Sequence, residues 1–166
     1  MRKAAILVVS DRCSRGEAKD LTGLELSRLL CEKGWNVAAI KIIPDDEDAI
    51  EEVLQEWADG GLAELILTAG GTGLGPRDVT PEATKRVLER EADGIIQLIR
   101  SEGMKITPRA ALSRAVAGTL GKSLIINLPG SPKAAGESFL AVAEILPHAM
   151  EMLCGGGHPD KEKNAK

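Results

Sequence analysis

Two aspartates lie beside glycine- and proline-rich connections in this sequence, where metal and phosphate chemistry is possible. Residues 68–81 read TAGGTGLGPRDVTP, with Asp78 just after the glycines, and Asp45 follows Pro44 at the start of an acidic stretch. Glycine lets backbone N–H groups approach a phosphate closely. A carboxylate would repel that phosphate unless a cation lay between them, and Mg²⁺ favours one or two carboxylates together with phosphate oxygens.

Each of these residues also has a purely structural interpretation. Asp45 lies where a helix is expected to begin, and position alone favours helix capping over chemistry because aspartate is a preferred N-cap residue. Asp78 could be a turn residue or the surface partner of Arg77. The glycine loop alone fits a flexible connector as well as an anion site. The next helix, expected to begin with Thr80 as its N-cap and Pro81 at its first position, favours the anion, since its N-terminus carries a positive dipole end.

A second stiff turn, NLPGSP at residues 127–132, joins a buried strand to another helix, which we expect Ser131 to cap and Pro132 to begin. Ordinary strand-to-helix turn chemistry explains it as well as an anion or ring-edge site with the Ser131 hydroxyl as a donor. Two further polar pairs at element ends are weaker candidates: Ser10–Asp11 and Ser113–Arg114.

Several other chemical signatures are incomplete. Pro76 stands where a G-x-G-x-x-G fingerprint needs its third glycine, and these glycines follow the third expected strand instead of the first. Residues 118–123, GTLGKS, end like a P-loop, but Val116 replaces its first glycine and a strand follows. Two histidines and three scattered cysteines predict no zinc site, and no G-x-S-x-G elbow supports a serine triad.

Composition and charge restrict the class of protein. The 166 residues predict one domain, 1–154, followed by a polar, glycine-rich tail, 155–166, that we expect to be disordered. A net charge of −4 with scattered basic residues and only 2% aromatic residues disfavours nucleic-acid binding. No apolar run approaches the roughly 20 residues of a membrane span. An odd number of distant cysteines, with no signal peptide, predicts a cytoplasmic protein.

Strands and helices are expected to alternate along the chain. Apolar runs predict strands at 4–10, 36–43, 62–68, 115–119 and 123–129. Helical spacing and caps predict helices at 22–33, with a Thr22–Glu25 capping box, and at 45–59, 80–92, 95–104 and 132–153. The pattern predicts a three-layer α/β sandwich: a mostly parallel sheet with one antiparallel strand pair and helices on both faces. The polar loops 10–16, 44–46, 69–79 and 128–132 would then meet at the carboxyl ends of the strands.

Several motifs, in order, resemble the Mog/MoaB family, which includes molybdopterin adenylyltransferases and a domain of gephyrin-like proteins. They are VSD…S-x-G, IIPDDE, GGTG…RDVTPEAT, ITPRAALSRAVAG and INLPGSP, and the resemblance spans residues 4–153. It implies a homotrimer that binds molybdopterin, a pterin with a dithiolene and a terminal phosphate. It also implies Mg²⁺-dependent transfer of AMP from ATP to that phosphate, with release of pyrophosphate and delivery of the product to a molybdate-insertion protein.

The resemblance places the two essential acidic positions of the family on Asp45 and Asp78, as metal-holding catalytic residues. It implies that other motif residues bind the substrates: Ser10, Asp11, Ser14, Gly70, Gly71, Thr72, Gly73, Ser113, Arg114, Asn127, Pro129, Gly130 and Ser131. Two alternatives stay open, namely a non-catalytic molybdopterin-binding protein of the same fold and a trimeric scaffold.

Overall fold

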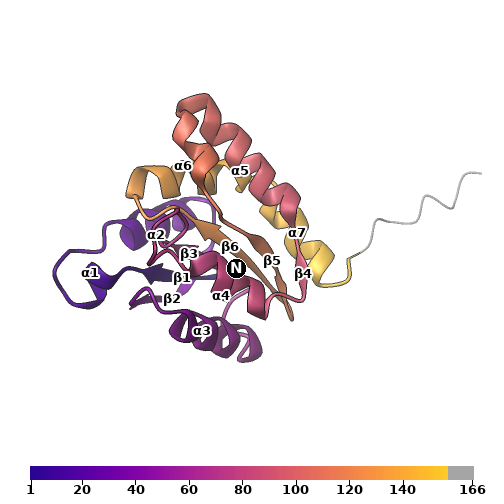
Figure 1. The fold of residues 1–166 in the computed structure, drawn as a ribbon. Helices are drawn as coiled ribbons and strands as arrows, with labels where there is room; N and C mark the ends of the chain where they lie inside the picture. The colour runs from indigo at the N-terminus through magenta and orange to yellow at the C-terminus, as the bar shows by residue number, and fades with distance from the viewer. Residues whose placement is uncertain (157–166) are drawn as a thin grey trace, which may run out of the picture.

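Runs of aliphatic residues form the central sheet because their side chains are buried on both faces. The computed structural model describes residues 1–156, and in it one six-stranded sheet runs through the middle of the molecule (Figure 1). Residues 157–166, most of the tail predicted to be disordered, lie outside the described part. Across the sheet the strands are β2 (Asn36–Ile43), β1 (Lys3–Val9), β3 (Leu65–Ala69), β6 (Ser123–Leu128), β5 (Ala117–Leu120) and β4 (Arg90–Glu91).

Alternation of side chains along the strands divides the interior into two cores, one on each face of the sheet. In β1, Ala4, Ile6 and Val8 enter one core, and Ala5, Leu7 and Val9 enter the other. The first core is covered by α2 (Thr22–Glu32), α5 (Asp93–Ile106), α6 (Pro132–Val142) and α7 (Leu146–Leu153). The second is covered by α3 (Glu47–Asp59) and α4 (Thr80–Val87). Figure 1 shows α3 and α5 on opposite sides of the sheet.

The predicted fold class is therefore confirmed. β2, β1, β3 and β6 are parallel, and β5 pairs antiparallel with β6 through a turn at Gly121, whose φ is +57°. The short β4, which was not predicted, adds a further antiparallel pairing to β5. After β1 the chain turns to β2 at one edge and then crosses to β3 on the other side of β1. The strand order reverses there, and such a reversal opens a crevice at the carboxyl ends of the strands.

Two predicted helices are shorter than expected. The chain predicted as one helix over 132–153 is divided into α6 and α7, and Pro147 lies in the first turn of α7, where its missing N–H costs nothing. The helix predicted over 80–92 ends at Val87, because Arg90 and Glu91 pair with β5. Within residues 1–156, none of the helices has the length and apolarity needed to cross a membrane.

Two predicted caps are also wrong. Leu21, not Thr22, is the N-cap residue of α2, and the Thr22 hydroxyl donates instead to the carbonyl oxygen of Gly130 at 2.7 Å. The N-cap residue of α4 is Val79, which makes no side-chain cap, and the Thr80 hydroxyl is buried without a hydrogen-bond partner among the described residues. The predicted Ser131 cap of α6 is confirmed, since its hydroxyl accepts from the N–H of Ala134.

Asn127 links the sheet to a covering helix from inside the protein. Its side chain is fully buried, and its amide nitrogen donates to the hydroxyls of Thr68 in β3 at 2.8 Å and Thr84 in α4 at 2.9 Å. Its amide oxygen accepts from the N–H of Val116 at 3.2 Å. Asn127 was predicted to bind substrate, but both polar atoms of its side chain are hydrogen-bonded inside the protein.

Replacing Asn127 with Ala should lower the free energy of unfolding by about 3 kcal/mol, because buried groups left without partners cost about 1–3 kcal/mol each. Urea unfolding followed by circular dichroism measures the change. Asn36, exposed on the edge strand β2, provides the matched control, and Asn36→Ala should stay within about 0.5 kcal/mol of the wild type. Equal stabilities of the two variants would contradict this role for Asn127.

Candidate functional site

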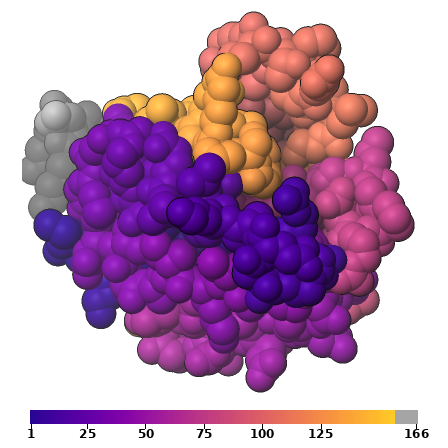
Figure 2. Space-filling view, turned by 90° about the vertical axis from the view of Figure 1, so that its left-hand side faces the viewer, coloured from indigo at the N-terminus to yellow at the C-terminus, as the bar shows by residue number. Residues whose placement is uncertain are grey.

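Four connections meet at the carboxyl ends of the parallel strands and line one pocket of about 380 Å³. They follow β1, β2, β3 and β6, the four loops that the sequence predicted to meet. Figure 2 views the molecule from this side, with the indigo segment around α1 (Asp11–Ser14) in front. We call this the aspartate pocket; its polar and glycine lining includes Ser10, Asp45, Gly70, Gly71, Asp78 and Gly130.

The first glycines of the loop at 70–79, hereafter the glycine loop, are required by close contacts with backbone and side-chain atoms. Gly70 has φ +110°, and a Cβ there would lie 2.2 Å from the carbonyl oxygen of Val9. A Cβ on Gly130 would lie 3.2 Å from Gly70 Cα. At Gly71, with φ +62°, a Cβ would lie 2.4 Å from Thr80 Oγ1. The loop is therefore a packed structure with fixed contacts, not a plain connector.

Asp45 is not the cap of α3, so its carboxylate is available for another role. Asp46 is the N-cap residue, with its side chain accepting from the N–H of Ala49 at 2.9 Å. Asp45 Oδ2 instead accepts from the backbone N–H of Asp11 at 2.8 Å, and Asp11 Oδ1 accepts from the N–H of Asp45 at 3.1 Å. Asp45 Oδ1 accepts no hydrogen bond from residues 1–156 and lies 3.1 Å from where a Gly71 Cβ would stand.

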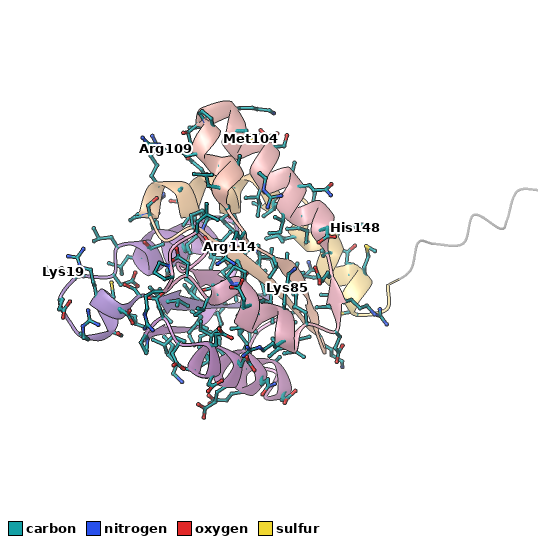
Figure 3. The ribbon with its side chains drawn as sticks, in the orientation of Figure 1. Lys19, Lys85, Met104, Arg109, Arg114 and His148 are labelled. Carbon is teal, nitrogen blue, oxygen red and sulfur yellow. The ribbon has the colours of Figure 1, made fainter. Side chains whose placement is uncertain are left out.

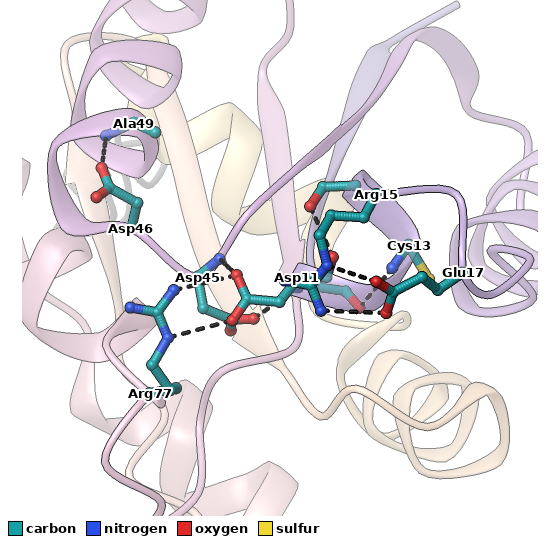
Figure 4. A network of polar contacts seen from close by, with 10 residues as sticks. Asp11, Cys13, Arg15, Glu17, Asp45, Asp46, Ala49 and Arg77 are labelled. Carbon is teal, nitrogen blue, oxygen red and sulfur yellow. Dashed lines mark hydrogen bonds and ion pairs between the residues drawn. The ribbon is translucent and has the colours of Figure 1, made fainter.

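Asp11 is itself held by Arg77, which reaches across from the glycine loop (Figure 4). Arg77 Nε and Nη2 donate to the two oxygens of the Asp11 carboxylate, each at 3.1 Å. These bonds hold the pKa of Asp11 below its ordinary value. Burial raises the pKa of Asp45 above its ordinary value, and the charges of Asp11 and Asp78 act in the same direction. Asp45 is therefore the carboxylate of this network that gains most from a nearby cation.

Asp78 is anchored by its own loop. Its Oδ2 accepts from the N–H of Gly75 at 2.8 Å, and its backbone N–H donates to the Gly75 carbonyl at 3.0 Å. A Cβ on Gly73 or Gly75 would lie 2.9 or 2.8 Å from the same oxygen, so both positions must be small. Arg77 does not pair with Asp78, which removes one of the structural interpretations of this residue. Its Oδ1 accepts no hydrogen bond from the described chain.

The two carboxylates fit a hard cation that keeps part of its own water or phosphate shell. Each uses one oxygen on a backbone N–H and leaves the other free, and oxygen donors of this kind suit Mg²⁺. Residues 1–156 contain no group of three or more His, Cys, Asp or Glu side chains that could hold a metal. An ion at Asp45 and Asp78 would therefore complete its coordination with water or substrate.

Lys19 is a residue of the site that the sequence did not indicate. It is the only Lys or Arg in the lining of the aspartate pocket, on the loop between α1 and α2, and it has no ion-pair or hydrogen-bond partner among residues 1–156 (Figure 3). A single lysine in a polar segment carries no motif, so only the fold reveals its place.

A second pocket, also of about 380 Å³, lies on the other side of the glycine loop. Thr72 and Gly73 form part of its wall, and its lining is mainly apolar, from α5, η1 (Pro108–Leu112) and the start of α6. Figure 2 shows the hollow between the orange start of α6 and the salmon end of α5. Two arginines add positive charge: Arg100, which donates to the carbonyl of Ser113 at 3.0 Å, and Arg109, labelled in Figure 3. We call this the apolar pocket.

The predicted substrate-binding residues are thus distributed over several places. Ser10, Gly70, Gly71 and Gly130 line the aspartate pocket. Asp11 is bonded to Asp45, which lines this pocket, but does not line it itself. Thr72, Gly73, Ser113 and Pro129 line the apolar pocket. The remaining four line neither pocket: Ser14, whose hydroxyl donates to the Asp11 carbonyl, Arg114, the buried Asn127 and the helix cap Ser131.

Comparison with known proteins identifies the family of this chain. The family model described as a probable molybdopterin binding domain matches residues 5–148. The chain belongs to this family. The motifs of the glycine loop, of the Asp45 turn and of the NLPGSP turn fall within the matched residues, and the resemblance inferred from them is confirmed.

Relatives of the molybdopterin-binding family match over most of this chain. The molybdopterin adenylyltransferase of Helicobacter pylori is 40% identical over 161 residues, which cover 96% of this chain and 92% of that protein. The molybdenum cofactor synthesis protein cinnamon of Drosophila melanogaster is 44% identical over 149 residues, 89% of this chain but only 25% of that protein. The crystal structure of the molybdopterin biosynthesis enzyme MoaB from Thermus thermophilus has a TM-score of 0.88 at 50% identity, covering 93% of this chain and 98% of that one.

The opposite pKa shifts of Asp11 and Asp45 predict opposite effects of neutralisation on stability. The lowered pKa of Asp11 means that its ionised form stabilises the fold above its unfolded pKa, and that this contribution is lost as pH falls through its folded pKa. The raised pKa of Asp45 means that its protonated form stabilises the fold below its unfolded pKa. This contribution is lost as pH rises through its folded pKa. At pH 7, Asp11→Asn should therefore melt below the wild type, while Asp45→Asn should melt at or above it.

Thermal melts of both variants between pH 3 and pH 8 measure these differences. Both should shrink toward acid pH, where the wild-type carboxylates are protonated. A strongly lowered melting temperature of Asp45→Asn at pH 7 would contradict the interpretation of Asp45 as a disfavoured charge.

Proposed function

We propose that this protein is a molybdopterin adenylyltransferase that transfers AMP from ATP to the terminal phosphate of molybdopterin in molybdenum cofactor biosynthesis. The observation that carries the proposal is the pair of anchored carboxylates, Asp45 and Asp78, each with one free oxygen beside a glycine loop. Membership of the molybdopterin-binding family and high coverage of the Helicobacter pylori enzyme support the choice of substrate and reaction.

The two pockets suit two parts of such a reaction. The apolar pocket has mainly apolar walls and a few polar groups, which suits a pterin ring. The aspartate pocket lies at helix N-termini and exposes glycine backbone, which suits phosphates. Because the glycine loop separates the pockets, a molybdopterin with its ring on one side can extend its phosphate toward the other.

The chemistry is an in-line displacement at phosphorus. A terminal phosphate oxygen of molybdopterin forms a bond to the α-phosphorus of ATP, and the bond from that phosphorus to the pyrophosphate oxygen breaks. The free oxygens of Asp45 and Asp78 would hold Mg²⁺, which neutralises the phosphates and the departing pyrophosphate. The chain itself supplies orientation: the anchored carboxylates, the backbone donors of the glycine loop and the N-terminus of α6 at Ser131.

Lys19 fits this chemistry as a phosphate contact. The pocket holds three carboxylates, those of Asp20, Asp45 and Asp78, and one lysine. An anionic substrate needs positive charge there beyond the metal, and the unpaired ammonium of Lys19 provides it in the lining of the pocket that we propose for the phosphates.

Several finer expectations stay predictions. A homotrimer, delivery of the product to a molybdate-insertion protein, a cytoplasmic location, and the requirement for ATP and Mg²⁺ each need their own measurement. The alternative is a protein of the same family that binds molybdopterin without turnover. Asp45 and Asp78 argue against it, since pure binding does not require two carboxylates beside a phosphate site.

Incubation with molybdopterin, ATP and Mg²⁺ should produce adenylylated molybdopterin and pyrophosphate. Asp45→Ala and Asp78→Ala should each lower kcat on the order of 10²–10³-fold, the scale for removing a group that stabilises developing charge. Asp46→Ala is the matched control, because this neighbouring aspartate caps α3: it should lose about 1 kcal/mol of stability and keep its turnover.

The outcomes separate the candidate functions. A folded wild type that binds molybdopterin without releasing pyrophosphate would establish the carrier and refute the enzyme. Turnover that survives both Asp45→Ala and Asp78→Ala would keep the enzyme but remove the carboxylates from its chemistry.

Replacing Lys19 with Ala should raise the KM for ATP about tenfold with a smaller change in kcat, the scale of one charge-assisted hydrogen bond. Lys19→Arg should restore most of the affinity, because it keeps the charge. Lys33 at the far end of α2 is the control: it pairs with Glu144 at 2.9 Å, and Lys33→Ala should leave the KM unchanged. Identical KM values for the two alanine variants would exclude Lys19 from phosphate binding.

A further inference from the structure

Arg114 joins the two ends of the glycine loop. Its backbone N–H donates to the carbonyl of Thr72 at 2.9 Å, and its Nε donates to the carbonyl of Gly73 at 2.6 Å. Its Nη2 donates to the carbonyl of Asp78 at 2.5 Å. One residue, labelled in Figure 3, therefore binds the loop where it leaves β3 and again where it enters α4.

Glu82 in the first turn of α4 fixes the guanidinium in this position. Arg114 Nη1 donates to Glu82 Oε1, so the carboxylate and the two loop carbonyls of Gly73 and Asp78 occupy different edges of one planar group. Burial acts to raise the pKa of Glu82, but the hydrogen bond and the charge of Arg114, together with the backbone N–H of Glu82 itself and the charge of Lys85, hold the pKa below its ordinary value. Glu82 thus remains a carboxylate, and the pair is a charged brace across the loop.

Arg114 is placed to act on the loop, not on a ligand. It lines neither the aspartate pocket nor the apolar pocket, whereas Arg100 and Arg109 line the latter. Three of its N–H groups are already directed at Gly73, Asp78 and Glu82. Lysine could replace it only in part, since one ammonium cannot present a rigid fork to three acceptors.

We propose that Arg114, held by Glu82, is a positioning residue that sets the free oxygen of Asp78 for a divalent cation. The proposal rests on the proposed function for the role of Asp78. The carboxylate is anchored at Oδ2 by the N–H of Gly75 and at its own backbone by Arg114, and these two anchors together fix where Oδ1 points. Without the brace, the main chain at Asp78 keeps only bonds made within the loop itself.

Mn²⁺ titration of the full chain, followed by electron paramagnetic resonance, tests the proposal in the absence of any substrate. Arg114→Ala should weaken Mn²⁺ binding about tenfold, the lower end of the range for residues that orient metal ligands. Arg114→Lys and Glu82→Gln should fall between this variant and the wild type. Arg86 on α4 is the matched control: it pairs with Glu47 and Glu51 on α3, away from the loop, and Arg86→Ala should bind Mn²⁺ like the wild type.

Amide hydrogen exchange gives a second measurement that needs no metal. Exchange at the N–H groups of Gly75 and Thr80, which bond within the loop, should accelerate in Arg114→Ala and not in Arg86→Ala. Unchanged exchange would overturn the brace, and faster exchange with unchanged Mn²⁺ affinity would overturn its effect on Asp78. If the wild type binds no Mn²⁺, the metal part of the proposed function fails, and loop exchange alone decides whether Arg114 braces the loop.

Discussion

The site depends on the close approach of three backbones at Gly70. The register of the sheet brings the last residues of β3 and β6 opposite each other, Ala69 beside Leu128, and the N–H of Gly70 then donates to the Leu128 carbonyl at 3.1 Å. A side chain at position 70 would meet the Val9 carbonyl at 2.2 Å, so the loops after β1 and β3 can meet only if this residue is glycine. The chain turns sharply at Gly70. Because of this turn, Asp78 lines the same pocket as Asp45, which follows β2.

Local signals were sufficient to predict the main strands and helices, but not the short elements α1, β4 and η1. A strand such as β1 is predicted by its own continuous apolar run. The start of α6 is predicted by the turn just before it, at Gly130, Ser131 and Pro132. The meeting of four polar loops followed from the rule that parallel strands end at one edge of the sheet. The role expected for Asp45 rested on resemblance, and the structure adds the physical reason: Asp46 caps the helix in its place.

Interactions between distant residues could not be predicted. The Thr22 hydroxyl has the spacing of a capping box, but it bonds to Gly130, 108 positions away, which no local pattern reveals. Asn127 and Arg114 belong to motifs that suggested substrate contacts. The two hydroxyls that accept from the Asn127 amide lie 43 and 59 positions away, and the three groups that accept from the Arg114 guanidinium lie 32–41 positions away. A motif marks a residue as important without saying whether it contacts a ligand or holds a residue that does.

The charges of the site show why ligand binding and stability are coupled in this fold. Asp45 is half-buried beside two other carboxylates, so its ionised form is disfavoured in the free protein. Arg77 neutralises Asp11 but leaves the free oxygens of Asp45 and Asp78 facing one pocket. A cation placed between them would reverse the sign of this interaction, turning repulsion between carboxylates into attraction toward a shared ion. Because such a ligand binds only the folded chain, its binding energy adds to the stability of the fold, which offsets the unfavourable charge that the site must carry when empty.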